Sequence, residues 1–265
     1  MLIDTHCHLD ATELDRDRAA VLAASQEKGV AAIVVPAIAR DNFDAVIQLS
    51  QQYPQCVYAF GIHPLFVDGA KPEDISSLRS YVENNTPVAI GEIGLDYFVT
   101  KANIETQTYY FTEQLKIAKD YDLPVLLHSR RSVDDVLKYL RRFKLKGGIA
   151  HAFNGSLQQA EQFIQLGFKL GFGGAMTYDR ALRIRELAIK LPLDAIVLET
   201  DSPDIPPEWL GHHGRNTPLE LPKIAEVLAD LRGENIAQVV DITSSNAIKV
   251  MPKLADLCTR PKALH

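Results

Sequence analysis

The sequence predicts an α/β protein, folded as a (β/α)8 barrel of the TIM type with extra C-terminal helices. Two observations indicate this fold. Short apolar runs alternate with longer amphipathic stretches along nearly the whole chain, and eight such runs can be counted. The length of 265 residues suits a single barrel, so we expect one domain over residues 1–265. A doubly wound open sheet produces much the same alternation and stays open as an alternative.

The predicted strands are short and rich in β-branched or apolar residues. In chain order they cover residues 2–6, 31–37, 57–62, 88–93, 125–128, 148–151, 168–172 and 195–200. They are continuous apolar runs rather than strict alternations of apolar and polar residues. That pattern is expected of parallel strands whose two faces are both covered by other structure.

The segments between the strands show helical spacing. One example keeps a single apolar face through steps of seven, four and three residues, at Ile104, Phe111, Leu115 and Ala118. After the eighth strand comes a loop over residues 202–216 that is rich in proline, glycine and histidine. Two further helical patterns follow, and the first begins with Thr217 and Glu220 in the spacing of a capping box.

Composition excludes several classes of protein. The three cysteines are scattered without a Cys-x-x-Cys pair, which argues against a disulfide framework or a zinc ribbon. We find neither a signal-peptide pattern nor an apolar stretch near the ~20 residues of a membrane span, and we expect a cytoplasmic protein. The net charge of −6 argues against a broadly positive nucleic-acid-coating surface. Residues 129–146 are nevertheless rich in basic side chains, including Arg130 and Arg131.

Imidazole and carboxylate side chains follow the predicted strands at one end. In a parallel barrel the chemistry lies at the carboxyl ends of the strands. Each residue has an ordinary alternative role, such as a hydrogen-bonded core histidine, an ion pair or a turn. Burying several of them together is costly unless a cation compensates, so their common position predicts a metal centre. The residues are His6, His8, His63, Glu92, His128, His151, Glu199 and Asp201.

The types of side chain limit the metal. Imidazole and carboxylate without thiolate suit Zn²⁺, Mn²⁺, Fe²⁺, Co²⁺ or, with fewer histidines, Mg²⁺. The candidate ligands are more than one tetrahedral ion needs, and they suit two ions with a carboxylate between them. That arrangement serves phosphoryl and acyl hydrolysis. The candidates are His6, His8, Glu92, His128, His151 and Asp201.

Seven motifs together resemble the TatD-type metal-dependent deoxyribonucleases, which belong to the amidohydrolase-like TIM barrels. They are "DTHCHLD" at 4–10, "GIHP" at 61–64, "GEIGLDY" at 91–97, "HSR" at 128–130, "HAFNG" at 151–155, "ETDSP" at 199–203 and "GRNTP" at 214–218. The resemblance extends to about Val250. The chain departs from the usual "HCFSG" after the sixth strand and from a form like "GISG" after the seventh, and both departures concern substrate preference.

The resemblance implies a role for each site residue. Two divalent ions, Mg²⁺, Mn²⁺ or Zn²⁺, are expected, with Glu92 bridging them. One ion would bind His6, His8 and Asp201, and the other would bind His128 and His151. His63, Arg130 and Arg215 would lie near the substrate, with the arginines contacting phosphate.

The predicted function is metal-dependent hydrolysis of phosphodiester bonds in DNA, as an exonuclease acting on single strands or 3′ ends. Asp201 and Glu92 are the expected catalytic residues, with Asp201 as general base. Glu199 shares the strand face of Asp201 and either orients a metal-bound histidine or forms a structural ion pair. The alternative enzyme class hydrolyses a small amide, ester or lactone, or an aminoacyl-tRNA ester. A non-catalytic metal-binding protein is the third possibility.

Overall fold

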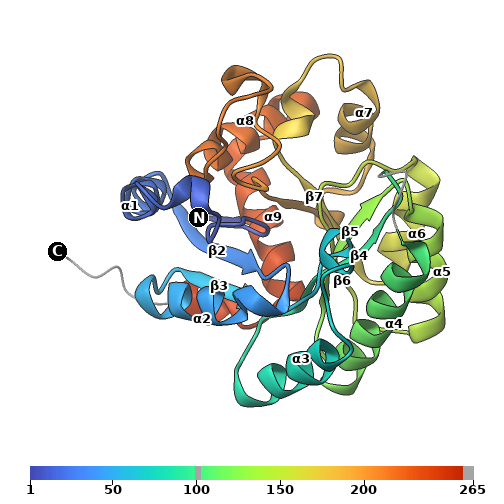
Figure 1. Ribbon diagram of the computed structural model, residues 1–265. Helices are drawn as coiled ribbons and strands as arrows, with labels where there is room; N and C mark the ends of the chain where they lie inside the picture. Colours follow the sequence, from blue (N-terminus) through green and yellow to red (C-terminus); the bar gives the residue numbers. More distant parts are fainter. Residues whose placement is uncertain (99–102, 259–265) are drawn as a thin grey trace.

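Eight parallel strands follow one another in chain order in the computed structural model, with helices around them (Figure 1). The structure describes residues 1–98 and 103–258. The strands are β1 Leu2–Asp4, β2 Val30–Pro36, β3 Cys56–Ala59, β4 Ile90–Asp96, β5 Val125–Arg130, β6 Gly148–Ala150, β7 Phe168–Phe172 and β8 Ile196–Leu198. Each overlaps one of the eight predicted strands, which confirms the predicted order of elements.

Helices connect the strands and continue beyond the last one. Those between strands are α1 Arg18–Glu27, α2 Phe43–Gln52, α3 Glu73–Asn84, α4 Ile104–Asp120, α5 Val133–Phe143, α6 Leu157–Gln165 and α7 Leu182–Lys190. The extra C-terminal helices are α8 Leu221–Arg232, α9 Ile236–Val250 and α10 Leu254–Cys258. None of the helices described here has the length and apolarity to span a bilayer.

The barrel closes at two irregular seams. Strands β1, β2 and β3 pair in that order in one sheet, and β4, β5, β6, β7 and β8 pair in that order in another. At the first seam a single bridge pairs Phe60 with Ile90, and the Gly91 N–H donates to the Phe60 carbonyl at 2.8 Å. At the second seam the Thr5 N–H donates to Leu198 and the Asp201 N–H donates to His6. This closure excludes the doubly wound open sheet.

Apolar side chains form two clusters on opposite faces of the strands. The larger cluster lies between the strands and the surrounding helices. The smaller one contains alternate strand residues such as Leu126, Ile149 and Val197, together with Ala247 of α9 and Met251, which follows that helix. The smaller cluster is therefore the barrel interior, and α9 packs against one end of it. Residues that follow these apolar strand residues by two positions also point into the barrel. They carry the polar side chains at the opposite end of the barrel from α9.

A β-bulge in β4 explains the orientation of its side chains. Ile90 pairs with Val125 and Ile93 pairs with Leu127, so one extra residue is inserted into β4 between them. Ile90 and Ile93 consequently both pack in the outer cluster although three positions separate them. Glu92 was expected at the end of its strand, but it lies inside β4, next to this bulge.

Two details of the elements differ from expectation. β1 ends at Asp4, so His6 and His8 belong to the segment that follows the strand. The predicted capping box at Thr217 is wrong, because Thr217 makes no side-chain cap and a short 3-10 turn precedes α8. The Glu220 carboxylate instead accepts a hydrogen bond from the Trp209 indole at 2.6 Å.

Candidate metal centre

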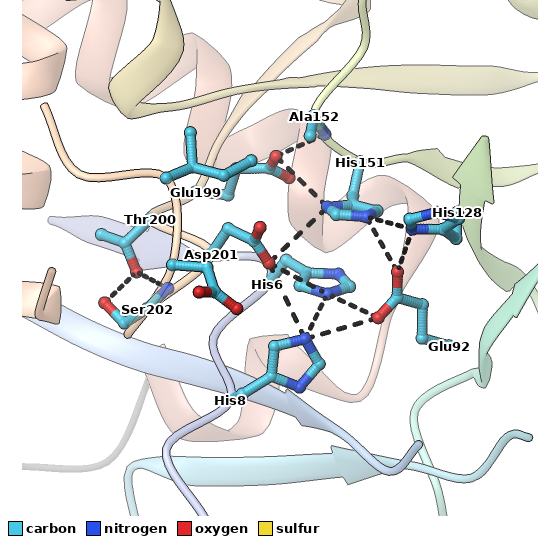
Figure 2. A network of polar contacts seen from close by, with 12 residues as sticks. His6, His8, Glu92, His128, His151, Ala152, Glu199, Thr200, Asp201 and Ser202 are labelled. Carbon is cyan, nitrogen blue, oxygen red and sulfur yellow. Dashed lines mark hydrogen bonds and ion pairs between the residues drawn. The ribbon is translucent and has the colours of Figure 1, made fainter. Parts of the chain in front are cut away.

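Glu92 contacts several histidines of the polar cluster, and dashed lines in Figure 2 join it to His6, His8, His128 and His151. Its Oε2 is 3.2 Å from His6 Nε2 and 3.4 Å from His8 Nε2. Asp201 Oδ1 lies 3.6 Å from the same His6 atom and 3.7 Å from the same His8 atom. We call His6, His8 and Asp201 the Oε2 group, and their donor atoms all lie within 4.8 Å of one another.

The other oxygen of Glu92 faces a separate set of imidazoles. Its Oε1 is 2.8 Å from His151 Nε2, 3.0 Å from His128 Nδ1 and 3.5 Å from His63 Nε2. We call His63, His128 and His151 the Oε1 group. One carboxylate thus has a different donor group at each of its oxygens.

Burial and charge put these donors in unlike protonation states. Burial favours the neutral form of Glu92, but the charges of the surrounding histidines outweigh it and hold the pKa of its carboxyl well below the usual range. Burial, reinforced by the charge of His151, lowers the pKa of His6 to about 3. Burial also opposes a charge on His151, yet the carboxylates of Glu92 and Asp201 raise its pKa well above 6.5.

The donor set fits a divalent metal. His6, Glu92, His151 and Asp201 are buried, and they belong to groups whose potential ligand atoms lie within 4.8 Å of one another. Buried polar atoms normally have partners, and buried charges are normally paired or bind a metal. Neutral imidazole and carboxylate are ligands of Zn²⁺ and Mn²⁺. A bound cation would take the place of the protons that Glu92 shares with the surrounding histidines. It would thereby let several imidazoles lie close together around one carboxylate.

Asp201 is held in an uncommon backbone conformation. Its φ is +58°, in the left-handed region that residues with a side chain adopt only at a cost. The Asp4 carboxylate accepts hydrogen bonds from Thr200 N at 3.0 Å and from Thr200 Oγ1 at 2.6 Å. The Asn216 amide donates to the Thr200 carbonyl at 2.7 Å. These contacts fix the turn, and sequence reasoning assigned no role to Thr200 or Asn216.

Glu199 contacts the backbone next to His151. Its Oε1 accepts a hydrogen bond from Ala152 N at 2.5 Å and lies 3.7 Å from His151 Nδ1. Its Oε2 is buried without a partner among the described residues. A Cβ on Gly171 would lie 2.1 Å from this Oε2, so the position of Glu199 requires glycine at 171.

Gly171→Ala should therefore displace Glu199. We expect a loss of about 1–3 kcal/mol in the free energy of unfolding, as for other overpacked sites. Hydrolysis should fall at least about tenfold, because His151 loses the carboxylate that faces it. Urea unfolding and kcat at saturating metal would measure both effects. Gly69→Ala is the control, since its Cβ would meet only the Phe66 carbonyl oxygen at 3.8 Å. Equal behaviour of the two variants would refute this account.

Asp96 is a site residue that sequence reasoning missed. Its Oδ2 is 2.9 Å from His128 Nε2, and its Oδ1 accepts a hydrogen bond from the Phe98 N–H at 2.8 Å. Burial opposes a charge on His128, but hydrogen bonds to Asp96 and Glu92 outweigh it and raise its pKa. Glu92 and Asp96 share one face of β4, and their spacing of four in "GEIGLDY" was the available signal.

Asp96→Asn should weaken metal binding. A carboxylate on the second ring nitrogen orients a ligating histidine and raises its basicity, and its loss costs about 10–100-fold in metal affinity. Isothermal titration with Mn²⁺ or Zn²⁺ would measure the change. Asp204→Asn removes the same charge from an exposed position on the cleft and should leave the affinity unchanged. An unchanged affinity in Asp96→Asn would show that this contact is merely structural.

The cluster opens into a large cleft. Its volume is about 1460 Å³, and its lining includes donors from both groups as well as Phe98 and Arg130.

The family model described as "TatD related DNase" matches residues 3–252. The chain belongs to the TatD family. It is 41% identical over 248 residues to YjjV of Escherichia coli K12, named an uncharacterized metal-dependent hydrolase, covering 92% of this chain and 95% of that protein.

A human relative and a solved structure support the same family assignment. Identity to human deoxyribonuclease TATDN3 is 33% over 271 residues, covering 97% of this chain and 96% of that one. The crystal structure of E. coli YjjV superposes with a TM-score of 0.91 at 40% identity, covering 95% of this chain and 98% of the other. The chain is therefore a metal-dependent hydrolase of the TatD family, and its predicted barrel is confirmed.

Two predicted substrate residues of this TatD chain have different surroundings. Arg130 lines the cleft. Arg215 does not: its guanidinium donates to both Asp17 carboxylate oxygens at 2.8 and 2.6 Å and to the Glu13 carbonyl at 2.8 Å. This bidentate pair occupies the guanidinium and ties Arg215 to the first loop. We therefore leave Arg215 out of the proposed substrate contacts.

Proposed function

We propose that this TatD-family hydrolase cleaves phosphodiester bonds in DNA and uses two divalent ions. The single observation that supports two ions is Glu92, whose Oε2 faces His6 and His8 while its Oε1 faces His128 and His151. A carboxylate between two donor groups is the arrangement of two-metal hydrolytic sites.

The proposed ligands follow these groups. His6, His8 and Asp201 would hold one ion, and His128 and His151 the other, with Glu92 between them. His63 lies beside the second ligand set, 3.5 Å from Glu92 Oε1, within reach of substrate in the cleft. When bound, the ions lower the pKa of water toward neutrality and polarise the phosphoryl group.

The protein side chains would position and move protons. Asp201 directs Oδ1 at the histidines, and within the described residues its Oδ2 makes no hydrogen bond or ion pair. That oxygen can accept a proton from the attacking water, so Asp201 is the proposed general base. Glu199 would orient His151 from the opposite side of the ring, through the contact with Nδ1.

The volume of the cleft supports a polymeric substrate. Pockets for small ligands measure about 300–1000 Å³. The cleft here is larger, at about 1460 Å³. The human relative is named a deoxyribonuclease. Arg130 on the cleft wall offers a planar guanidinium, which suits phosphate.

The decisive experiment is a substrate screen with Mg²⁺, Mn²⁺ and Zn²⁺. Single-stranded and double-stranded DNA, labelled at either end, would be compared with a panel of small amides, esters and lactones and an aminoacyl-tRNA ester. We expect cleavage of DNA, with single strands or 3′ ends preferred. Activity on the panel alone would overturn the DNA assignment. Metal binding without any turnover would favour a non-catalytic protein.

A further inference from the structure

Two arginine side chains converge on one aromatic ring at the wall of the cleft. Arg130 Cζ lies 3.6 Å from the ring centre of Phe98, and Arg131 Cζ lies 4.6 Å from it. All three residues line the cleft. Phe98 as a residue is 43% exposed, so it is only partly covered by the two arginines and their neighbours. Guanidinium groups at this distance from an aromatic ring are held by cation–π attraction.

The convergence depends on an unusual backbone conformation. Arg130 is the last residue of β5, and consecutive residues of a strand point to opposite faces. Arg131 has a φ of +58°, which turns the chain so that both side chains reach the same ring. The Ser132 hydroxyl donates to the Leu95 carbonyl at 2.5 Å and anchors this turn on β4. Such strain in a non-glycine residue is concentrated at functional sites.

The two guanidinium groups keep their hydrogen-bond donors available. Within residues 1–98 and 103–258, neither Arg130 nor Arg131 makes a side-chain hydrogen bond or an ion pair with a carboxylate. The third arginine of the cleft, Arg183, donates twice to Asn154 Oδ1. Stacking on a ring fixes a guanidinium and leaves its edge free, which is the arrangement that binds phosphate.

Asp96 connects this part of the wall to the metal centre. Its Oδ2 contacts His128, and its Oδ1 accepts the Phe98 N–H. The Tyr97 N–H donates to the Arg130 carbonyl at 2.8 Å. The ring and the two guanidinium groups are therefore held at a fixed displacement from the Oε1 group. Because the metal centre and this wall line the same cleft, a strand with one phosphate at the metal centre can extend along the cleft to the wall.

We propose that Phe98, Arg130 and Arg131 form a phosphate subsite for a non-scissile phosphate of the nucleic-acid strand. The inference rests on the proposed function and narrows its substrate class. A substrate needs at least two phosphate groups on one backbone to occupy the metal centre and the subsite together. The subsite thus selects an oligonucleotide over a diester with one phosphate. Phe98 acts as a positioning residue for the two arginines.

The test compares two substrates in two variants, Arg131→Gln and Phe98→Leu. One substrate is a single-stranded oligonucleotide and the other is bis(p-nitrophenyl) phosphate, which has a single phosphate. We expect KM for the oligonucleotide to rise about tenfold, with little change in kcat on either substrate. The slope of log KM against log salt should fall by about 0.7 for a lost phosphate contact. Arg142→Gln, on the exposed surface of α5, is the control for loss of charge.

Binding of the labelled oligonucleotide in EDTA separates failure of the subsite from failure of the proposed function. Weaker binding by both variants than by the wild type supports the subsite, whether or not DNA is cleaved. Wild-type binding by both variants overturns the subsite and leaves the DNase proposal standing if DNA is cleaved. Failure of the wild type both to bind and to cleave the oligonucleotide overturns both. An equal rise in KM for the two substrates also contradicts the subsite.

Discussion

Glu92→Gln should lower phosphodiester hydrolysis by at least about 1000-fold, because one carboxylate serves both donor groups. An amide keeps a single oxygen and turns an NH₂ group toward one set of imidazoles. Its oxygen can then complete only one of the two sets. We expect the bound metal to fall from two ions to one or fewer per chain, measured by elemental analysis after dialysis, together with the loss of kcat.

The control for this variant is Glu13→Gln. Glu13 is an exposed residue of the cleft, and its replacement removes the same charge without touching the cluster. It should keep both ions and full activity. Circular dichroism should show that Glu92→Gln retains its helices and strands. Two tightly bound ions and undiminished turnover in Glu92→Gln would refute the bridging role.

Removal of metal should abolish hydrolysis and lower the melting temperature. A ligand that binds only the folded state at 100 times its Kd stabilises that state by about 2.7 kcal/mol. For a domain of this size each kcal/mol corresponds to about 2–4 °C, so each ion should raise Tm by about 5–10 °C. The physical reason is that only the folded chain brings donors such as His6 and His151 together, so the free energy of metal binding adds to the stability of the folded state.

Thermal unfolding with EDTA, and again after adding Mn²⁺ or Zn²⁺, measures this effect. Activity and Tm should return together as metal is restored. His8→Ala, which lacks one donor of the Oε2 group, should show a smaller shift than the wild type. Metal-free protein that cleaves DNA at the normal rate would exclude the proposed mechanism.

The period of the strands made much of the site predictable from sequence. His128 and His151 each stand two residues after an inward apolar residue, Leu126 and Ile149 respectively. Strand alternation alone therefore places both imidazoles in the mouth of the barrel. Glu92 is different, because its position depends on the bulge between Ile90 and Ile93. A bulge is a property of pairing with the next strand and leaves no mark in the local apolar pattern.

Contacts between segments that are far apart in the sequence could not be predicted either. Arg215 occurs in a motif beside the site, yet its partner is Asp17, 198 positions away in the sequence. Nothing in either segment specifies that pairing, so the sequence led us to expect a phosphate contact for an arginine that instead pairs with Asp17. Asp96 had the converse difficulty. Its spacing from Glu92 was visible, but its contact with His128 required the register of β4 against β5.

The two seams of the barrel give the metal centre a mechanical role. His6, His8 and His63 follow strands of the β1–β3 sheet, whereas Glu92, His128, His151 and Asp201 lie in or after strands of the β4–β8 sheet. The ion held by His6, His8, Asp201 and Glu92 would therefore have ligands from both sheets, and the other ion would have His63 of the β1–β3 sheet beside its ligands from the β4–β8 sheet. The ions would link the two sheets at the seams, where few backbone hydrogen bonds join them. Assembly of the catalytic centre and locking of the barrel would then be a single event.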